Sequence, residues 1–162
     1  MRVLILERKG ITAAQQSSSG NTDDSFVSRV PFQEAIRKST VLFISCTFNE
    51  SMRNMIDTPE LDGMRPEMII INVSRGGVMR TSAVVQALRE KRISGAAVDV
   101  FDQEPASTAK DSAFLADDTR DLNLTFSPHV GYFSTKTMST MKSMVKQKIK
   151  DYVSGDWSDF EA

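Results

Sequence analysis

The 162-residue chain has little of several features that define large protein classes: it has one cysteine, a net charge of −1 and no long apolar run. With Cys46 alone, an intramolecular disulfide is excluded, and we expect a reducing, cytoplasmic location. The balanced charge provides no attraction to nucleic acid or to an anionic membrane. No stretch approaches the roughly 20 apolar residues of a membrane span. We therefore expect neither nucleic-acid nor membrane partners.

The segment Met68–Pro105 has the pattern of a strand, a turn, a helix, a second strand and an acidic loop. Residues 68–73 are apolar apart from Asn72, which predicts a strand buried on both faces. Thr81 is the expected N-cap of a helix whose apolar residues recur at helical spacing, and residues 96–100 are the second predicted strand. Together they form a βαβ unit, which implies a parallel α/β sheet.

Strands and helices alternate along the rest of the sequence. The opening residues MRVLILERKG have a short apolar core without a small-residue cleavage site, which predicts a strand at 2–6 rather than a signal peptide. Further strands are expected at 41–46 and 123–127, helices at 32–39, 58–64 and 134–154, and polar loops at 8–29 and 106–122. We expect one doubly wound α/β domain over residues 1–155, with a flexible insertion at 8–29 and an acidic tail at 156–162.

Three residues with catalytic potential follow three of the predicted strands: Arg75, Glu104 and His129. His129 is the only histidine, and histidine exchanges protons near neutral pH. A neighbouring carboxylate raises the pKa of a histidine, and an arginine presents a planar fork to a carboxylate. Taken singly, each is explained more readily by a surface ion pair, a solvated loop or a strand cap. At one edge of a parallel sheet, the three together favour a site for a 2-hydroxy or 2-oxo acid.

Other acidic residues allow further interpretations. Glu7, at the end of the first predicted strand, is suited to accept hydrogen bonds from ribose hydroxyls, or it is a solvated charge beside Arg8 and Lys9. The aspartates of residues 106–122 lack the oxygen-ligand spacing of an EF-hand loop. We therefore predict no metal site.

Three motifs, INVSRGG, GAAVDVFDQEP and SPHVGYFS, resemble in order and spacing those of the D-isomer-specific 2-hydroxyacid dehydrogenase family. The resemblance covers nearly all of residues 1–155 apart from the two polar loops. It implies that Arg75 binds the substrate, that His129 is the catalytic acid and base, and that Glu104 pairs with His129. The implied activity is NAD-dependent oxidoreduction between 2-hydroxy and 2-oxo acids.

The resemblance also implies where NAD binds. Asp99 matches the aspartate near the nicotinamide carboxamide, and Glu7 matches the acidic residue on the adenosine ribose. Cys46 and Thr47 lie at a strand end that contacts the cofactor in this family, although the proline usual there is absent. Because the cofactor domains of the family dimerise, the resemblance implies a homodimer.

The chain also departs from the family pattern. It contains no G-x-G-x-x-G turn, the element whose backbone N–H groups and helix N-terminus bind the cofactor pyrophosphate. By comparison with the family, the first strand and the substrate domain are absent as well. The sequence therefore predicts an incomplete Rossmann-like sheet with severely weakened NAD binding.

Three functions are compatible with these features. The first is the inherited D-2-hydroxyacid dehydrogenase chemistry, impaired as an independent activity. The second is a repurposed, cofactor-independent enzyme that uses Arg75, Glu104 and His129 for the cyclisation, isomerisation or dehydration of a carbonyl substrate. The third is a non-catalytic partner subunit.

Overall fold

The computed structural model describes residues 3–6, residue 9 and residues 29–155. The chain forms two compact units, Met1–Pro128 and His129–Ala162, and each is described by itself. The first unit contains all the strands described below, and the second contains the last helix.

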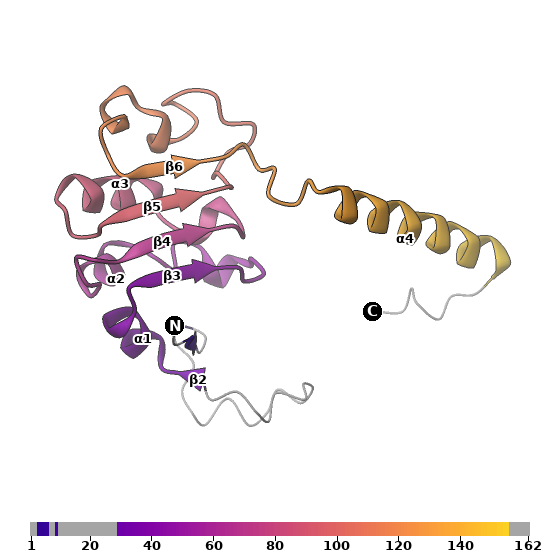
Figure 1. Cartoon of the computed structure of the whole chain (residues 1–162), viewed down its shortest axis with the longest axis horizontal. Helices are drawn as coiled ribbons and strands as arrows, with labels where there is room; N and C mark the ends of the chain where they lie inside the picture. Colours follow the sequence, from indigo (N-terminus) through magenta and orange to yellow (C-terminus); the bar gives the residue numbers. More distant parts are fainter. Residues whose placement is uncertain (1–2, 7–8, 10–28, 156–162) are drawn as a thin grey trace. The chain divides into compact units, whose positions relative to one another are not determined.

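The main element of the first unit is a four-stranded parallel sheet. Its strands are β3 (Val41–Ile44), β4 (Ile69–Asn72), β5 (Gly95–Val98) and β6 (Leu124–Phe126), in the order β3-β4-β5-β6. Figure 1 shows the four arrows pointing the same way. The prediction of a parallel α/β sheet is confirmed, because each crossover between neighbouring strands passes through a helix or a long connection.

A second, two-stranded parallel sheet pairs β1 (Ile5–Leu6) with β2 (Arg29–Val30). The first predicted strand is therefore shorter than expected, and Ile5 is exposed. Arg29 was assigned to the loop, which was wrong, because a two-residue strand is too short to show a hydrophobic period. The rest of the predicted insertion, apart from Lys9, lies outside the described residues.

The four-stranded sheet is buried on one face only within its unit. Leu42, Ile44 and Ile70 are each at most 6% exposed, whereas Val41 is 51% and Phe43 58% exposed. The prediction that the strands are buried on both faces was therefore wrong for this unit. A continuous apolar run indicates that both faces favour burial, but it does not indicate what covers each face.

Three helices contribute to the core on the buried side: α1 (Phe32–Lys38), α2 (Thr58–Asp62) and α3 (Thr81–Arg89). Leu61 of α2 and Val84 of α3 are fully buried, and each such side chain contributes about 1.5–3 kcal/mol of burial free energy. The helix α2 begins with a capping box formed by Asp57 and Glu60, which satisfies two backbone N–H groups at its start.

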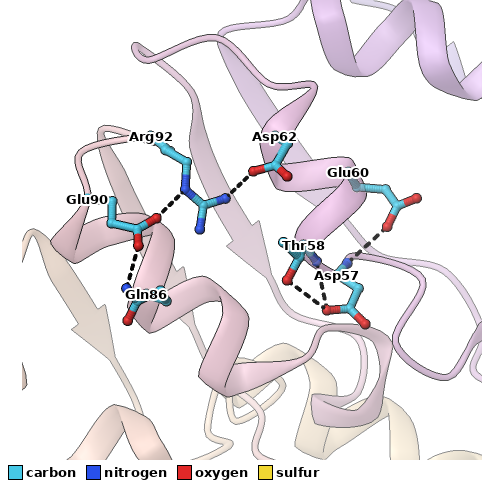
Figure 2. Close-up of polar contacts among 7 residues, drawn as sticks. All are labelled: Asp57, Thr58, Glu60, Asp62, Gln86, Glu90 and Arg92. Carbon is cyan, nitrogen blue, oxygen red and sulfur yellow. Dashed lines mark hydrogen bonds and ion pairs between the residues drawn. The ribbon is translucent and has the colours of Figure 1, made fainter.

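Ion pairs join α2 to the turn after α3 (Figure 2). Arg92 donates from Nη1 to Asp62 at 2.5 Å and from Nε to Glu90 at 2.6 Å. Gln86, one turn earlier in α3, donates to Glu90 in the same network. Because α2 and α3 are in contact, the network fixes the ends of two helices that cover the same face of the sheet.

The connection between β5 and β6 is more ordered than its polar sequence indicates. It contains two 3-10 turns, η4 (Ala113–Leu115) and η5 (Asp117–Thr119), and Phe114 is buried in the core. The Thr119 hydroxyl is within hydrogen-bond distance of the carbonyl oxygens of Phe114 and Ala116, at 2.9 and 2.7 Å. The segment is polar and largely exposed as predicted, but its buried aromatic residue, which anchors it to the core, was not predicted.

The second unit contains the long helix α4 (Thr135–Ser154). The Ser134 hydroxyl caps it by accepting the Thr137 N–H at 3.1 Å, and Gly155 ends it at φ 79°, as the sequence predicts. Its apolar stripe includes Met141, Val145 and Ile149, and no residue of α4 is buried.

Candidate functional site

The candidate residues of the first unit lie beyond the carboxyl ends of neighbouring parallel strands. Cys46 and Thr47 follow β3, Arg75 follows β4, and Asp99 and Glu104 follow β5. In a parallel sheet these ends share one edge, so the ends of β4 and β5, which bear Arg75 and Glu104, are neighbours. Open α/β sheets bind their ligands at this edge.

The turn that carries Arg75 is fixed by Asn72, the last residue of β4. Asn72 is fully buried, and its Oδ1 accepts the backbone N–H and the hydroxyl of Ser74, both at 3.0 Å. Its Nδ2 donates to the Arg75 carbonyl at 3.0 Å. The Arg75 side chain is exposed and donates to the Ser74 carbonyl at 2.7 Å. The guanidinium therefore extends from a turn that Asn72 holds at both Ser74 and Arg75.

Gly76 allows this turn to lie directly against the acidic loop after β5. A Cβ atom on Gly76 would lie 2.0 Å from the Phe101 carbonyl carbon and 2.3 Å from the Asp102 nitrogen. Both contacts are with backbone, so a side chain at this position would require the loops to separate. We call residues 72–78 and 99–104 the paired turns.

Two side-chain hydrogen bonds fix the acidic member of the paired turns. The Thr81 hydroxyl, at the start of α3, donates to Asp102 Oδ2 at 2.7 Å. Arg80, and not the predicted Thr81, occupies the N-cap position, and Thr81 is the first residue of α3. Glu104 Oε1 accepts the backbone N–H of Phe101 at 2.9 Å, so the predicted partner of His129 is oriented by its own loop.

Asp99 lies at the end of β5 and is buried, with 8% of its surface exposed. The Ser127 hydroxyl, from the segment after β6, donates to its Oδ1, and the Asp99 N–H donates to the Asn72 carbonyl at 3.0 Å. A buried carboxylate is stable only with hydrogen-bond donors around it. Ser127 therefore fixes the side chain that the family resemblance assigns to the nicotinamide.

A cleft of about 780 Å³ lies beside β3, the outer strand of the four-stranded sheet. Leu4, Ile5 and Leu6 line it in succession, and so do the consecutive residues 42–47, which include Cys46 and Thr47. Consecutive residues of a strand point to opposite faces, so a cleft lined by all of them runs along the strand edges. We call it the β1–β3 cleft.

A second arginine lies beside the paired turns, and the sequence did not indicate it. Arg53 donates from Nε and Nη2 to the Glu50 carboxylate, both at 2.8 Å, and stacks over Phe48 with its Cζ 5.4 Å from the ring centroid. Its Nη1 is 3.4 Å from the position of a Cβ on Gly77. The hydrogen bond with Arg53 is the main cause that lowers the pKa of Glu50, and in turn it raises the pKa of Arg53.

The other predicted site residues are not placed relative to the paired turns. His129 belongs to the second unit, where it is half-buried, adopts φ 53°, and makes an edge contact with Tyr132 at 5.9 Å between ring centroids. Glu7 lies outside the described residues. Among the described residues, no group of three histidine, cysteine or acidic side chains is arranged to hold a metal ion.

Asn72 and Gly76 were not selected as site residues from the sequence, although each gives a recognisable pattern. Asn72 is the one polar residue within an otherwise apolar strand, and a buried polar side chain requires hydrogen-bond partners. Gly76 belongs to a glycine pair directly after that strand, where close backbone approach is a common reason for glycine.

Residues 2–131 match the family model described as the D-isomer specific 2-hydroxyacid dehydrogenase, NAD binding domain. The chain belongs to this family. A provisionally named 2-hydroxyacid dehydrogenase of Haemophilus influenzae is 27% identical over 153 residues, which are 94% of this chain and 44% of that protein. A similarly named Staphylococcus aureus protein is 30% identical over 132 residues, 81% of this chain and 39% of its own length.

Solved structures show the same fold. A D-lactate dehydrogenase from Sporolactobacillus superposes with a TM-score of 0.72 at 23% identity, over 93% of this chain and 45% of that one. A D-lactate dehydrogenase from Aquifex aeolicus, complexed with NAD and lactic acid, gives 0.70 at 22% identity, over 80% and 42%. The chain spans less than half of the length of these proteins. The Rossmann-like α/β fold is therefore confirmed.

Among the described residues, no helix combines the length and the apolar character that crossing a bilayer requires.

Proposed function

We propose that this chain forms the substrate-binding half of a D-2-hydroxyacid dehydrogenase site. The supporting observation is the contact between the paired turns at Gly76, which brings the strand ends that bear Arg75 and Glu104 together in a member of this family. Arg75 binds the carboxylate of a 2-hydroxy or 2-oxo acid through its planar guanidinium. Because the Arg75 turn is held by Asn72, little conformational entropy is lost when the anion binds.

In this proposal His129 exchanges a proton with the C2 oxygen of the substrate, and Glu104 orients the imidazole. A carboxylate beside an imidazole stabilises the imidazolium form, which favours proton uptake from a hydroxyl group. Phe101 donates its N–H to Glu104, which fixes one carboxylate oxygen. NAD, when bound, supplies the acceptor for the hydride from C2.

The residues present fit part of the cofactor. The β1–β3 cleft, with Cys46 and Thr47 in its wall, has the volume for an adenosine group, and Asp99, which the resemblance assigns to the carboxamide, accepts a hydrogen bond from Ser127. The pyrophosphate has no matching turn, because the sequence contains no G-x-G-x-x-G. We therefore propose that NAD binds this chain weakly and that independent dehydrogenase turnover is impaired.

Substrate binding is tested by calorimetric titration of the chain with oxalate, a planar analogue of a 2-oxo acid. Arg75→Met removes the guanidinium, and we expect at least tenfold weaker binding, since a charge-assisted bidentate pair contributes about 1.5–3 kcal/mol. Arg53→Met is the matched control: this arginine lies beside the same turn but is paired with Glu50, and its loss is expected to change the affinity less than twofold. Unchanged binding in Arg75→Met contradicts the proposed role of Arg75.

The specific observation that favours a second function, cofactor-independent acid/base catalysis, is the absence of the phosphate-binding turn. A screen of carbonyl substrates without NADH, with His129→Ala as the control, separates the two. Turnover that requires His129 but no NADH supports the repurposed enzyme, whereas turnover that requires both supports the dehydrogenase. A chain that binds neither NADH nor oxalate and has no turnover supports a non-catalytic subunit.

We also propose that the chain forms a homodimer. The supporting observation is the exposed sheet face, on which Val41, Phe43 and Ile69 are all exposed, because contiguous apolar surface of this kind favours association. Sedimentation analysis over a range of concentrations tests the proposal. A monomer at every concentration contradicts it.

A further inference from the structure

Asn72 has no assigned role in the proposed chemistry, yet it is fully buried at the end of β4 and uses both ends of its carboxamide. A leucine of the same size would fill the same volume in the apolar strand without the cost of desolvating an amide. A buried polar side chain in this position therefore indicates a requirement other than packing.

The turn after β4 provides the hydrogen-bond partners of the Asn72 side chain. Asn72 Oδ1 accepts from the N–H and the hydroxyl of Ser74, and Nδ2 donates to the Arg75 carbonyl. Both residues are outside regular secondary structure, so their backbone groups have no ladder partner on this side. The carboxamide supplies an acceptor and a donor at once, a combination that no carboxylate or hydroxyl side chain provides in the same geometry.

The direction of the Arg75 side chain depends on the backbone that this carboxamide holds. The Arg75 carbonyl accepts from Asn72 on one side and from the Val78 N–H, at 3.3 Å, on the other. The next residue, Gly76, lies against the Phe101–Asp102 backbone. A rotation of the Arg75 backbone would therefore break two hydrogen bonds and move the turn against a fixed neighbour.

We propose that Asn72 is a positioning residue: its carboxamide holds the Ser74–Arg75 backbone so that the guanidinium of Arg75 meets the substrate carboxylate. This inference rests on the proposed function of Arg75 for its effect on binding. Its structural part, the ordering of the turn by Asn72, stands independently of that function.

Two variants test it, with two readouts. Asn72→Leu removes all three hydrogen bonds, and Asn72→Asp keeps an acceptor for Ser74 but loses the donor to Arg75. Amide hydrogen exchange at Ser74 reports the turn, and calorimetric titration with oxalate reports the guanidinium. Ile70→Val is the matched control, because Ile70 is buried on the same face of the same strand and has no hydrogen bond to the turn.

We expect exchange at Ser74 to be at least tenfold faster in Asn72→Leu and near the parent rate in Asn72→Asp. Oxalate binding is expected to weaken at least fivefold in both variants, and less than twofold in Ile70→Val. Ile70→Val separates the two roles. If Asn72 contributed only to stability, its replacement would lower stability without a selective loss of oxalate binding.

The two proposals fail in different ways. If oxalate binding in both Asn72 variants stays within twofold of the parent while Arg75→Met weakens it, the positioning role is overturned. If Arg75→Met has no effect, the proposed function fails, and exchange at Ser74 then decides the inference. Unchanged protection at Ser74 in Asn72→Leu then overturns its structural part as well, and faster exchange supports the structural part alone.

Discussion

Two regions of the Met1–Pro128 unit, the paired turns and the β1–β3 cleft, differ in how completely they are fixed. The paired turns are held by the Asn72 carboxamide, by the backbone contact at Gly76 and by the hydrogen bond from Thr81 to Asp102. The β1–β3 cleft separates a two-residue strand pair from a sheet whose outer face is exposed. Under the proposed function, the substrate contacts belong to the more completely fixed region and the cofactor contacts to the less fixed one.

The position of the β1–β3 cleft in the sheet explains why this region is less completely fixed than the paired turns. In a doubly wound sheet of order 3-2-1-4-5-6, the first strand lies between the second and the fourth. The cleft is lined by residues of β1 and of β3, and the family resemblance implies that β1 corresponds to the second strand of that order. We interpret the cleft as the place of that first strand, so the sheet is divided where the phosphate-binding element belongs.

The largest expected effect comes from separating the paired turns. In Gly76→Ala the added Cβ would lie 2.0 Å from a backbone carbon, and we expect a loss of at least about 3 kcal/mol in unfolding free energy, above the usual cost of overpacking. Urea unfolding measures it. Gly63→Ala is the control, since its Cβ would have only ordinary contacts from 3.4 Å. Equal stability of the two variants would contradict the close contact.

The next largest effect on stability is expected at the wall of the β1–β3 cleft, which Lys9 helps to line. Glu60 is buried and pairs with Lys9 Nζ at 2.7 Å, so it links the N-terminal segment to α2. We expect Glu60→Gln to lower the unfolding free energy by about 1–2 kcal/mol, because Lys9 loses its charged partner but regains water. Glu67→Gln, which removes an exposed pair with Arg65, is expected to change the unfolding free energy little, because solvent screens an exposed pair. A loss that small in Glu60→Gln would mean that the wall is not held by this pair.

A smaller effect is expected at the hydrogen bond between α3 and the acidic loop. Thr81→Val replaces the hydroxyl with a methyl group and leaves Asp102 without its donor, which we expect to lower the unfolding free energy by about 1 kcal/mol. Thr81→Ser keeps the donor and is expected to be closer to the parent. Parent-like stability of Thr81→Val would show that the hydrogen bond does not contribute.

The sequence predicted where the residues of the paired turns lie, but it did not predict the contacts that hold them. Arg75 and Glu104 were placed at neighbouring strand ends because parallel strands align their carboxyl ends, and apolar runs with a βαβ order are visible in one sequence. The contacts that fix them were not predicted. The approach of Gly76 to Phe101 and the bond from Thr81 to Asp102 join residues about 20 to 25 positions apart, and local patterns contain no information about such pairs.

The smallest expected effect is at the exposed pair Glu50–Arg53. The pKa of Glu50 is lowered, chiefly by its hydrogen bond with Arg53, so any stabilisation exists above the pKa of Glu50 in the unfolded chain and is lost as the pH falls through the lower, folded pKa. In Glu50→Gln we expect unfolding curves close to the parent at pH 7 and indistinguishable at acidic pH. A difference that grows on acidification would contradict the assigned cause.

The central claim is that the substrate contacts are retained while the cofactor site is incomplete, and titration of the chain with NADH tests it most directly. Without a phosphate-binding turn, we expect a dissociation constant above about 1 mM, which corresponds to a binding free energy weaker than about −4.1 kcal/mol. Fluorescence of the nicotinamide or calorimetry measures it. Binding of NADH at sub-millimolar concentration would contradict the claim.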